Sequence, residues 1–264
     1  MSRISGMFAQ LRRRKEKALI VYLTVGFPSM KMLPSLVKAA VEGGADLIEL
    51  GVPFSDPLAD GPTIQMASQK ALENGITVPK IFEAVKQLRR SGIKIPLVLM
   101  TYANPVFQYG LAQFCKKAAS VGVDGLIIPD LPPEEAGELL PLARAARLDT
   151  IFLTAPTSSP ERIRKIIRVS TGFVYSVSLT GVTGTRNELP SDLVAQARRI
   201  KKLSRVPVCV GFGISRPDQV RHVASVADGV IVGSALIQTI SKAGSANAPQ
   251  AVVRFLKGLK QACR

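Results

Sequence analysis

The sharpest candidate for chemistry is Glu49, an acidic residue between Ile48 and Leu50 in an apolar run. Burying a carboxylate is costly, so a glutamate at the end of a buried strand projects toward a pocket with a raised pKa, which suits proton transfer. The alternative is a structural glutamate that bonds to a neighbouring loop. Its position at the end of the run favours a general acid–base residue.

A second carboxylate follows in the long loop 53–62, which contains three prolines. Loops of this length usually carry function. The loop offers Asp56 and Asp60, and the sequence leaves both open. Asp60 precedes a Gly-Pro pair, which is also the pattern of a residue that caps a helix beginning near Pro62.

Two glycine-rich turns predict a phosphate site. Gly211-Phe212-Gly213-Ile214-Ser215 and Gly233-Ser234-Ala235 each follow an apolar run. Glycine lets backbone N–H groups approach an anion, and Ser234 adds a hydroxyl donor, although simple turn glycines are the alternative. The segment Ser178–Arg186 is rich in glycine and threonine and predicts either a lid over a substrate or a plain surface loop.

Other chemistries lack the residues they need. No lysine ends an apolar run, so a Schiff base has no nucleophile. The single histidine, His222, falls in a helical stretch, and Cys115, Cys209 and Cys263 are far apart. A metal site and a disulfide framework are therefore not expected. Acid–base chemistry by carboxylates remains, without a metal or a cofactor in this chain.

Eight β-branched apolar runs, each followed by a turn and an amphipathic helical stretch, must position these residues. This alternation predicts a buried parallel sheet, and eight units in a chain of this length predict an α/β fold of the (β/α)8 TIM barrel type. We expect one domain over residues 1–264 with an extra N-terminal helix. The expected strands are Leu19–Val25, Leu47–Leu50, Pro96–Met100, Gly125–Pro129, Thr150–Leu153, Phe173–Val177, Pro207–Val210 and Gly229–Val232.

The two ends of such a barrel have different tasks. The active site is built from the C-terminal strand ends, where Glu49, Gly211 and Gly233-Ser234 fall. Residues just before strands belong to the opposite, structural face, and these include Asp46, Asp124 and Asp228. Residues 241–249 predict a loop before a last helix, Gln250–Ala262.

The composition is strongly basic. Lys and Arg number 35 against 19 Asp and Glu, a formal net charge of +16. Basic clusters fall at residues 12–17 and 198–205, without the interleaved aromatics that stack on bases. We therefore expect solvated helix faces, with nucleic acid an unlikely partner. No apolar run reaches the ~18 residues of a membrane helix, and a cytoplasmic enzyme is expected.

Several segments give this sequence a family resemblance. The stretch Glu49–Gln65 resembles the signature of the tryptophan synthase α subunit family. Gly181-Val182-Thr183-Gly184 resembles the family's loop after strand six, and Gly211–Ser215 its phosphate loop. Phe8–Leu11 and Tyr102–Pro105 agree as well, so the resemblance spans essentially the whole chain.

The resemblance implies a metal-independent lyase that cleaves indole-3-glycerol phosphate into indole and glyceraldehyde 3-phosphate in tryptophan biosynthesis. It implies Glu49 and Asp60 as the catalytic pair. The implied substrate-binding residues are Ile64, Met100, Tyr175, Thr183, Gly184, Phe212, Gly213, Gly233 and Ser234. It also implies a partner, the β subunit with its pyridoxal phosphate, in an α2β2 heterotetramer.

Two rival interpretations stay open at the level of the sequence. Another phosphate-binding barrel, such as indole-3-glycerol phosphate synthase or phosphoribosylanthranilate isomerase, is one, although the synthase would need a lysine at a strand end. A non-catalytic basic barrel that binds RNA or an activating partner is the other. Intact Glu49, Asp60 and Ser234 argue against it.

Overall fold

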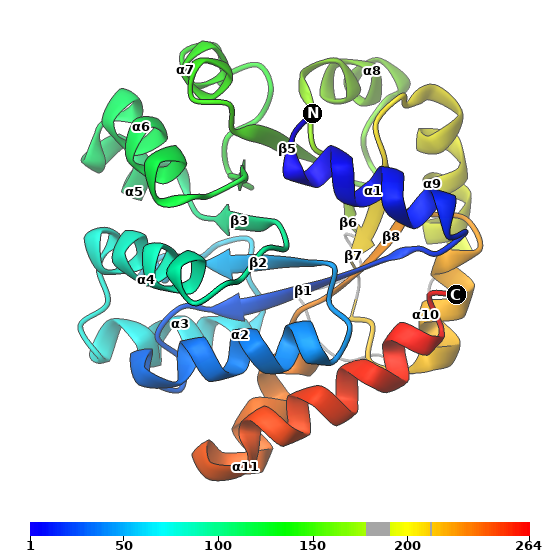
Figure 1. Ribbon diagram of the computed structural model, residues 1–264. Coiled ribbons are helices and arrows are strands. Elements are labelled where there is room, and N and C mark those ends of the chain that lie inside the picture. Colours follow the sequence, from blue (N-terminus) through cyan, green and yellow to red (C-terminus); the bar gives the residue numbers. More distant parts are fainter. Residues whose placement is uncertain (178–190, 212) are drawn as a thin grey trace.

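Eight parallel strands close into a barrel in which each strand pairs with its neighbours in the sequence and β8 pairs with β1 (Figure 1). The structure is a computed structural model that describes residues 1–177, 191–211 and 213–264. All eight expected strands are confirmed, with ends that differ by a few residues. They are β1 (Ala18–Thr24), β2 (Leu47–Gly51), β3 (Leu97–Met100), β4 (Gly125–Ile127), β5 (Asp149–Thr154), β6 (Val174–Val177), β7 (Val208–Gly211) and β8 (Gly229–Val232).

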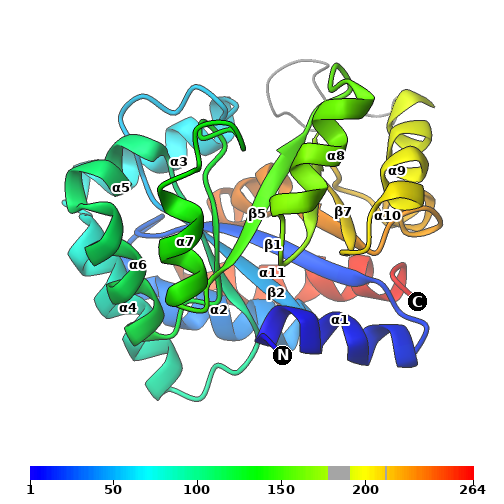
Figure 2. The ribbon, with the colours of Figure 1, turned by 90° about the horizontal axis from the view of Figure 1, so that it is seen from above.

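Helices surround the barrel, as Figure 2 shows. The expected α/β barrel with an extra N-terminal helix is therefore confirmed. The helices are α1 (Arg3–Arg13), η1 (Met30–Met32), α2 (Leu33–Glu42), α3 (Pro62–Glu73), α4 (Val78–Arg90), α5 (Ala103–Tyr109), α6 (Leu111–Val121), α7 (Leu139–Ala145), α8 (Pro160–Val169), α9 (Ser191–Leu203), α10 (Pro217–Ala224) and α11 (Ser234–Gln261). No described helix is long and apolar enough to cross a bilayer.

Helix α1 closes the N-terminal end of the barrel. Its buried residues Ile4, Phe8 and Leu11 join one apolar cluster with the residues that fill the barrel interior. The rings of Phe8 and Phe173 meet edge to face at 6.2 Å between centroids. Because this end is sealed by apolar packing, the C-terminal strand ends form the end at which a substrate can enter.

The aspartates that precede strands have a structural task, as the sequence predicts. Each accepts a hydrogen bond from the backbone N–H at the start of the preceding strand, and each forms an ion pair. The N–H bonds run from Leu19 to Asp46 at 2.7 Å, from Leu97 to Asp124 at 2.8 Å and from Val208 to Asp228 at 3.1 Å. These carboxylates therefore fix the register of neighbouring strands along the barrel axis and take no part in chemistry.

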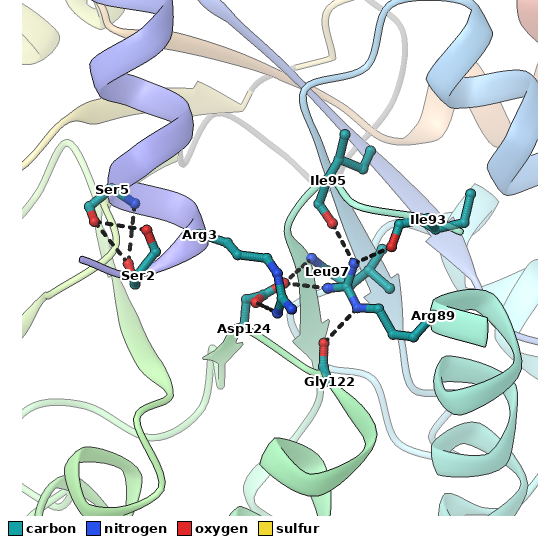
Figure 3. A network of polar contacts seen from close by, with 9 residues as sticks. All are labelled: Ser2, Arg3, Ser5, Arg89, Ile93, Ile95, Leu97, Gly122 and Asp124. Atoms are coloured by element: carbon teal, nitrogen blue, oxygen red, sulfur yellow. Dashed lines mark hydrogen bonds and ion pairs between the residues drawn. The ribbon is translucent and has the colours of Figure 1, made fainter. Parts of the chain in front are cut away.

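Figure 3 shows the most elaborate of these contacts, around Asp124. Asp124 binds the guanidinium groups of Arg3, from α1, and of Arg89, from α4. Arg89 also donates to the carbonyl oxygens of Ile93 and Ile95 at 2.8 Å. One buried carboxylate thus ties the sealing helix to two loops at the N-terminal end.

One expectation is wrong. Residues 241–249, expected as a loop, lie within α11, which extends from Ser234 to Gln261. Gly244 has φ 67° and introduces a kink, and Pro249 lies about one turn beyond it. Helical backbone resumes after Gly244 and includes Pro249 in its second turn, where the proline nitrogen cannot donate the usual hydrogen bond to residue 245.

Candidate active site

Glu49 lies on β2 at the open end of the barrel. Its side chain has 0% exposure, and in the described part of the chain neither carboxylate oxygen has a hydrogen-bond partner. Burial raises the pKa of this carboxyl to about 8. At neutral pH Glu49 is therefore mostly protonated, which equips it to give a proton away.

Asp60, and not Asp56, is the second carboxylate of the site. Asp60 is 6% exposed, whereas Asp56 is exposed and accepts a hydrogen bond from the hydroxyl of its neighbour Ser55. The helix cap that the sequence left open is not observed, because the N-cap of α3 is Gly61 and no side chain bonds to this end. Burial raises the pKa of Asp60 to about 6, and the hydrogen bond from Tyr102 opposes this rise.

Tyr102, which the sequence analysis did not include among the site residues, holds Asp60 in place. Its hydroxyl donates to Asp60 Oδ2 at 3.1 Å and accepts from the N–H of Ala59 at 3.1 Å. Its ring packs on Phe54 with 5.3 Å between centroids. The signals in the sequence were the place of Tyr102 two residues after the third apolar run and the family resemblance of Tyr102–Pro105.

The loop that carries Asp60 is fixed by its own backbone as well. The N–H of Asp60 bonds to the carbonyl oxygen of Pro57 at 2.9 Å, and its carbonyl oxygen accepts from Gln65 Nε2 at 2.8 Å. Gln65 belongs to the first turn of α3. A turn, a helix and a tyrosine from a neighbouring strand end therefore set the position of the Asp60 carboxylate together.

Two tyrosines line the barrel mouth beside the carboxylates. Tyr22 on β1 is the register partner of Glu49, and Tyr175 lies on β6. The pKa of each hydroxyl is raised well above its ordinary value, first by burial and then by the charges of Glu49 and Asp60. Both tyrosines therefore lie within electrostatic reach of both carboxylates.

Glycines on the neighbouring strands make room for these rings. A methyl group at Gly51 would collide with the ring of Tyr22, and one at Gly211 would lie 2.5 Å from the ring of Tyr175. Any larger residue at either position would displace a tyrosine. The two glycines thus shape the mouth of the barrel.

The expected phosphate residues lie at the ends of β7 and β8. These strands are neighbours, with Gly211 opposite Ile231. Gly213 has φ 46°, a conformation that glycine adopts without strain. Gly233 and Ser234 begin α11, and Ser234 is 6% exposed. Because the first N–H groups of a helix have no partner within it, this helix start can bind an anion.

Of the remaining expected substrate-binding residues, two lie in the described part of the structure and three lie outside it. Ile64 on α3 is 6% exposed and lies beside Gly233 and Tyr22. Met100 ends β3 and packs, partly buried, against the core. Thr183, Gly184 and Phe212 lie outside the described residues.

Fold and strand-end residues together define a (β/α)8-barrel enzyme with two buried carboxylates at its open end. Residues 8–264 match the family profile described as "Tryptophan synthase alpha chain". The alpha chain of Geotalea daltonii is 50% identical over 238 residues, 90% of each chain. That of Geobacter sulfurreducens is 47% identical over 262 residues, 99% of each.

Solved structures agree with these relatives. The tryptophan synthase subunit alpha of Legionella pneumophila superposes with a TM-score of 0.93 and 39% identity, covering 100% of this chain and 98% of that one. A structure of Mycobacterium tuberculosis tryptophan synthase gives 0.91 and 40%, over 100% and 98%. The chain belongs to the tryptophan synthase alpha chain family. It is a lyase of indole-3-glycerol phosphate in tryptophan biosynthesis. Members of this family act with a β subunit.

Proposed function

We propose that Glu49 and Asp60 are the catalytic pair that cleaves indole-3-glycerol phosphate. The observation that carries this proposal is the burial of two carboxyls at the open end of the barrel, Glu49 at 0% and Asp60 at 6% exposure, which raises the pKa of Glu49 to about 8 and that of Asp60 to about 6. At pH 7 one carboxyl is mostly protonated and the other mostly ionised. Two carboxyls kept in opposite protonation states supply an acid and an anion in one site.

The chemistry needs a place for the electrons of the broken C–C bond, and the indole ring provides it. Glu49 donates its proton to C3 of the ring, which turns the ring into an iminium-like acceptor. The C3′ hydroxyl then loses its proton to the glutamate, a C=O bond forms at C3′, and the C3–C3′ bond breaks as its electron pair neutralises the ring. Glu49 ends protonated, as it began.

Asp60 acts on the ring nitrogen. Positive charge develops there once C3 is protonated, and an ionised carboxylate that accepts the N–H hydrogen bond stabilises it. The hydrogen bond from Tyr102 keeps the pKa of Asp60 from rising further. Tyr102 is thus a positioning residue for the anion.

The rest of the substrate is held by the wall and the phosphate site. Ile64, Met100 and Tyr175 provide a largely apolar surface for the indole ring. Gly213, Gly233 and Ser234 offer N–H and hydroxyl donors to the phosphate. Thr183, Gly184 and Phe212 complete this set in the proposal.

This mechanism uses no metal, Schiff base or cofactor in this chain. Among the described residues no lysine is buried, so none lies in the barrel interior to attack a carbonyl. No three His, Cys, Asp or Glu side chains come together within the part of the chain that the structure describes. We assign pyridoxal phosphate to the β partner alone.

The β partner is proposed to dock on the active-site face, in an α2β2 assembly. Three large hydrophobic side chains are exposed there, Leu58 at 91%, Phe107 at 51% and Met66 at 44%. Leu58 belongs to the loop that carries Asp60, and Phe107 belongs to α5. Exposed apolar side chains of this kind are covered in a complex.

An indole-release assay on the purified chain with indole-3-glycerol phosphate tests the proposal. We expect slow release that rises on titration with β subunit, and loss of at least ~10²-fold in turnover for Glu49→Gln and for Asp60→Asn. Asp56→Asn, on the same loop but exposed, is the matched control and should retain turnover. Near-full turnover in either catalytic variant would remove that residue from the mechanism.

A further inference from the structure

Two cations occupy backbone positions that normally belong to glycine. Lys15 and Arg147 both have φ 57°, and within residues 1–177, 191–211 and 213–264 they are the only non-glycine residues with positive φ. Each stands just beyond a helix, α1 or α7. At the same place after α2, α3 and α4 the chain has glycine with positive φ, at residues 44, 75 and 92. A side chain there costs free energy that glycine avoids.

Both strained cations lie on the N-terminal face of the barrel, at opposite ends of α1. Arg147 lines a groove of about 930 Å³ together with Arg3 and Lys94. Lys15 lines a smaller cavity of about 250 Å³ together with Arg12 and Lys17. Figure 2 shows α1 lying along this face. An 11-residue helix is about 16 Å long, so about this distance separates the two groups of cations, and α1 carries no Lys or Arg between Arg3 and Arg12.

The acidic residues of this face are already neutralised. Asp124 binds Arg3 and Arg89, Asp228 binds Lys201, and Glu16 binds Lys260 and Arg264. In contrast, no acidic side chain of the described residues lies within ion-pair distance of the cations at positions 12, 13, 14, 15 and 17. We call the basic face the set Arg3, Arg12, Arg13, Arg14, Lys15, Lys17, Lys94 and Arg147.

The basic face is mainly charged, although apolar side chains line part of the groove and Met1 is fully exposed beside it. The large hydrophobic residues of α1 are buried or packed against the barrel, and α1 exposes none of them. A protein interface needs buried aromatic or aliphatic anchors, and membrane docking by a helix needs an apolar face to insert. A second copy of this chain would be repelled, because the protein is strongly basic.

We propose that the basic face is a docking surface for the phosphate backbone of nucleic acid. Such binding needs only cations that reach phosphates along a strand, and arginine matches phosphate through paired N–H donors. The span of about 16 Å between the two groups corresponds to about five nucleotides of one strand in B-form DNA. Without aromatic side chains to stack on bases, the binding is independent of sequence. Composition alone favoured solvated helix faces, and the strained cations are what changes that conclusion.

A fluorescent 20-base-pair DNA duplex of arbitrary sequence, titrated with the full chain at several salt concentrations, tests this. The double variant Lys15→Gly/Arg147→Gly should bind the duplex more weakly, on the order of 50-fold at about 0.1 M salt, and the slope of log affinity against log salt should flatten by about 1.8. Its Tm should rise, because glycine relieves the strain at both sites. A higher Tm together with a lower affinity for the duplex is the result expected if these cations serve binding and not stability.

Two control variants distinguish the effect of the charges at positions 15 and 147 from the effect of backbone strain and from the effect of the total charge of the protein. Lys15→Gln/Arg147→Gln keeps the strain, so binding should weaken as much while Tm does not rise. Lys31→Gln/Lys242→Gln removes two exposed charges away from the basic face and should leave affinity within about twofold. The proposal is overturned if the wild type does not retain the duplex at about 0.1 M salt. It is also overturned if this last pair weakens binding equally, or if phosphatidylserine vesicles bind and the duplex does not.

Discussion

Glutamine at position 49 should stabilise the fold while it removes activity. Glu49 is completely buried, and burial raises the pKa of its carboxyl from 4.5 to about 8. A protonated carboxyl and a primary amide have nearly the same shape, so Glu49→Gln alters little of the packing. At high pH the buried carboxyl of Glu49 must ionise in apolar surroundings. The amide of glutamine never ionises.

The size of the effect follows from proton linkage. The folded chain holds the Glu49 proton up to about pH 8, whereas the unfolded chain releases it near pH 4.5. Between these values the folded state binds more protons, so the stability of the wild type falls as pH rises. A pKa difference of one is worth about 1.4 kcal/mol. The free energy of unfolding of the wild type should therefore drop, relative to Glu49→Gln, by about 4 kcal/mol between about pH 5 and about pH 8.5.

Urea unfolding of both proteins at the two pH values measures this directly. Every other titratable group is common to wild type and variant, so the difference between the two curves isolates Glu49. Glu135→Gln, at an exposed position, is the matched control and should follow the wild type. Parallel pH dependences for wild type and Glu49→Gln would refute the raised pKa. The same pKa should appear in catalysis as a fall in kcat/KM of the wild type above about pH 8.

Three further substitutions test the rest of the site. Tyr102→Phe removes the hydrogen bond that lowers the pKa of Asp60, so the acidic limb of the kcat/KM profile should move to higher pH, and an unmoved limb would contradict this role. Ser234→Asp should raise KM far more than Ser234→Ala, because a fixed negative charge would face the phosphate; equal small effects would place the anion elsewhere. Gly211→Ala brings a methyl group within 2.5 Å of the Tyr175 ring and should destabilise the fold by about 1–3 kcal/mol, measured by urea unfolding. An unchanged midpoint would mean that the ring moves aside freely.

The barrel itself was predictable from the sequence, because a strand buried on both faces needs a continuous apolar run. Eight such runs coincide with the eight strands to within a few residues. Glu49 stood out for the same reason, as a carboxylate inside one of those runs. The aspartates before strands were assigned correctly to the structural face, since a turn that ends a helix places them at the N-terminal end of the barrel.

The sequence was less informative where several local patterns fit the same residues. It expected a loop at 241–249, because Gly244 and Pro249 are both common helix breakers. Packing decided otherwise: residues on both sides of the kink, including Ile240, Ala248 and Val252, are buried in the core. Helical backbone therefore forms on both sides of Gly244, although the glycine itself is not helical and breaks the helix into two segments at the kink.

Only the tertiary structure decided which groups meet. Position in the loop left Asp56 and Asp60 both open, and only the family resemblance favoured Asp60; in the structure Asp60 is buried and bonds to Tyr102, which lies 42 residues away in the sequence. The raised pKa values also depend on burial, which exists only in the folded chain. The strain at Lys15 and Arg147 is a backbone angle that no composition reveals. A local pattern determines which residues can be buried together, whereas the distance between two side chains is set only when the closed sheet brings remote strand ends to one mouth.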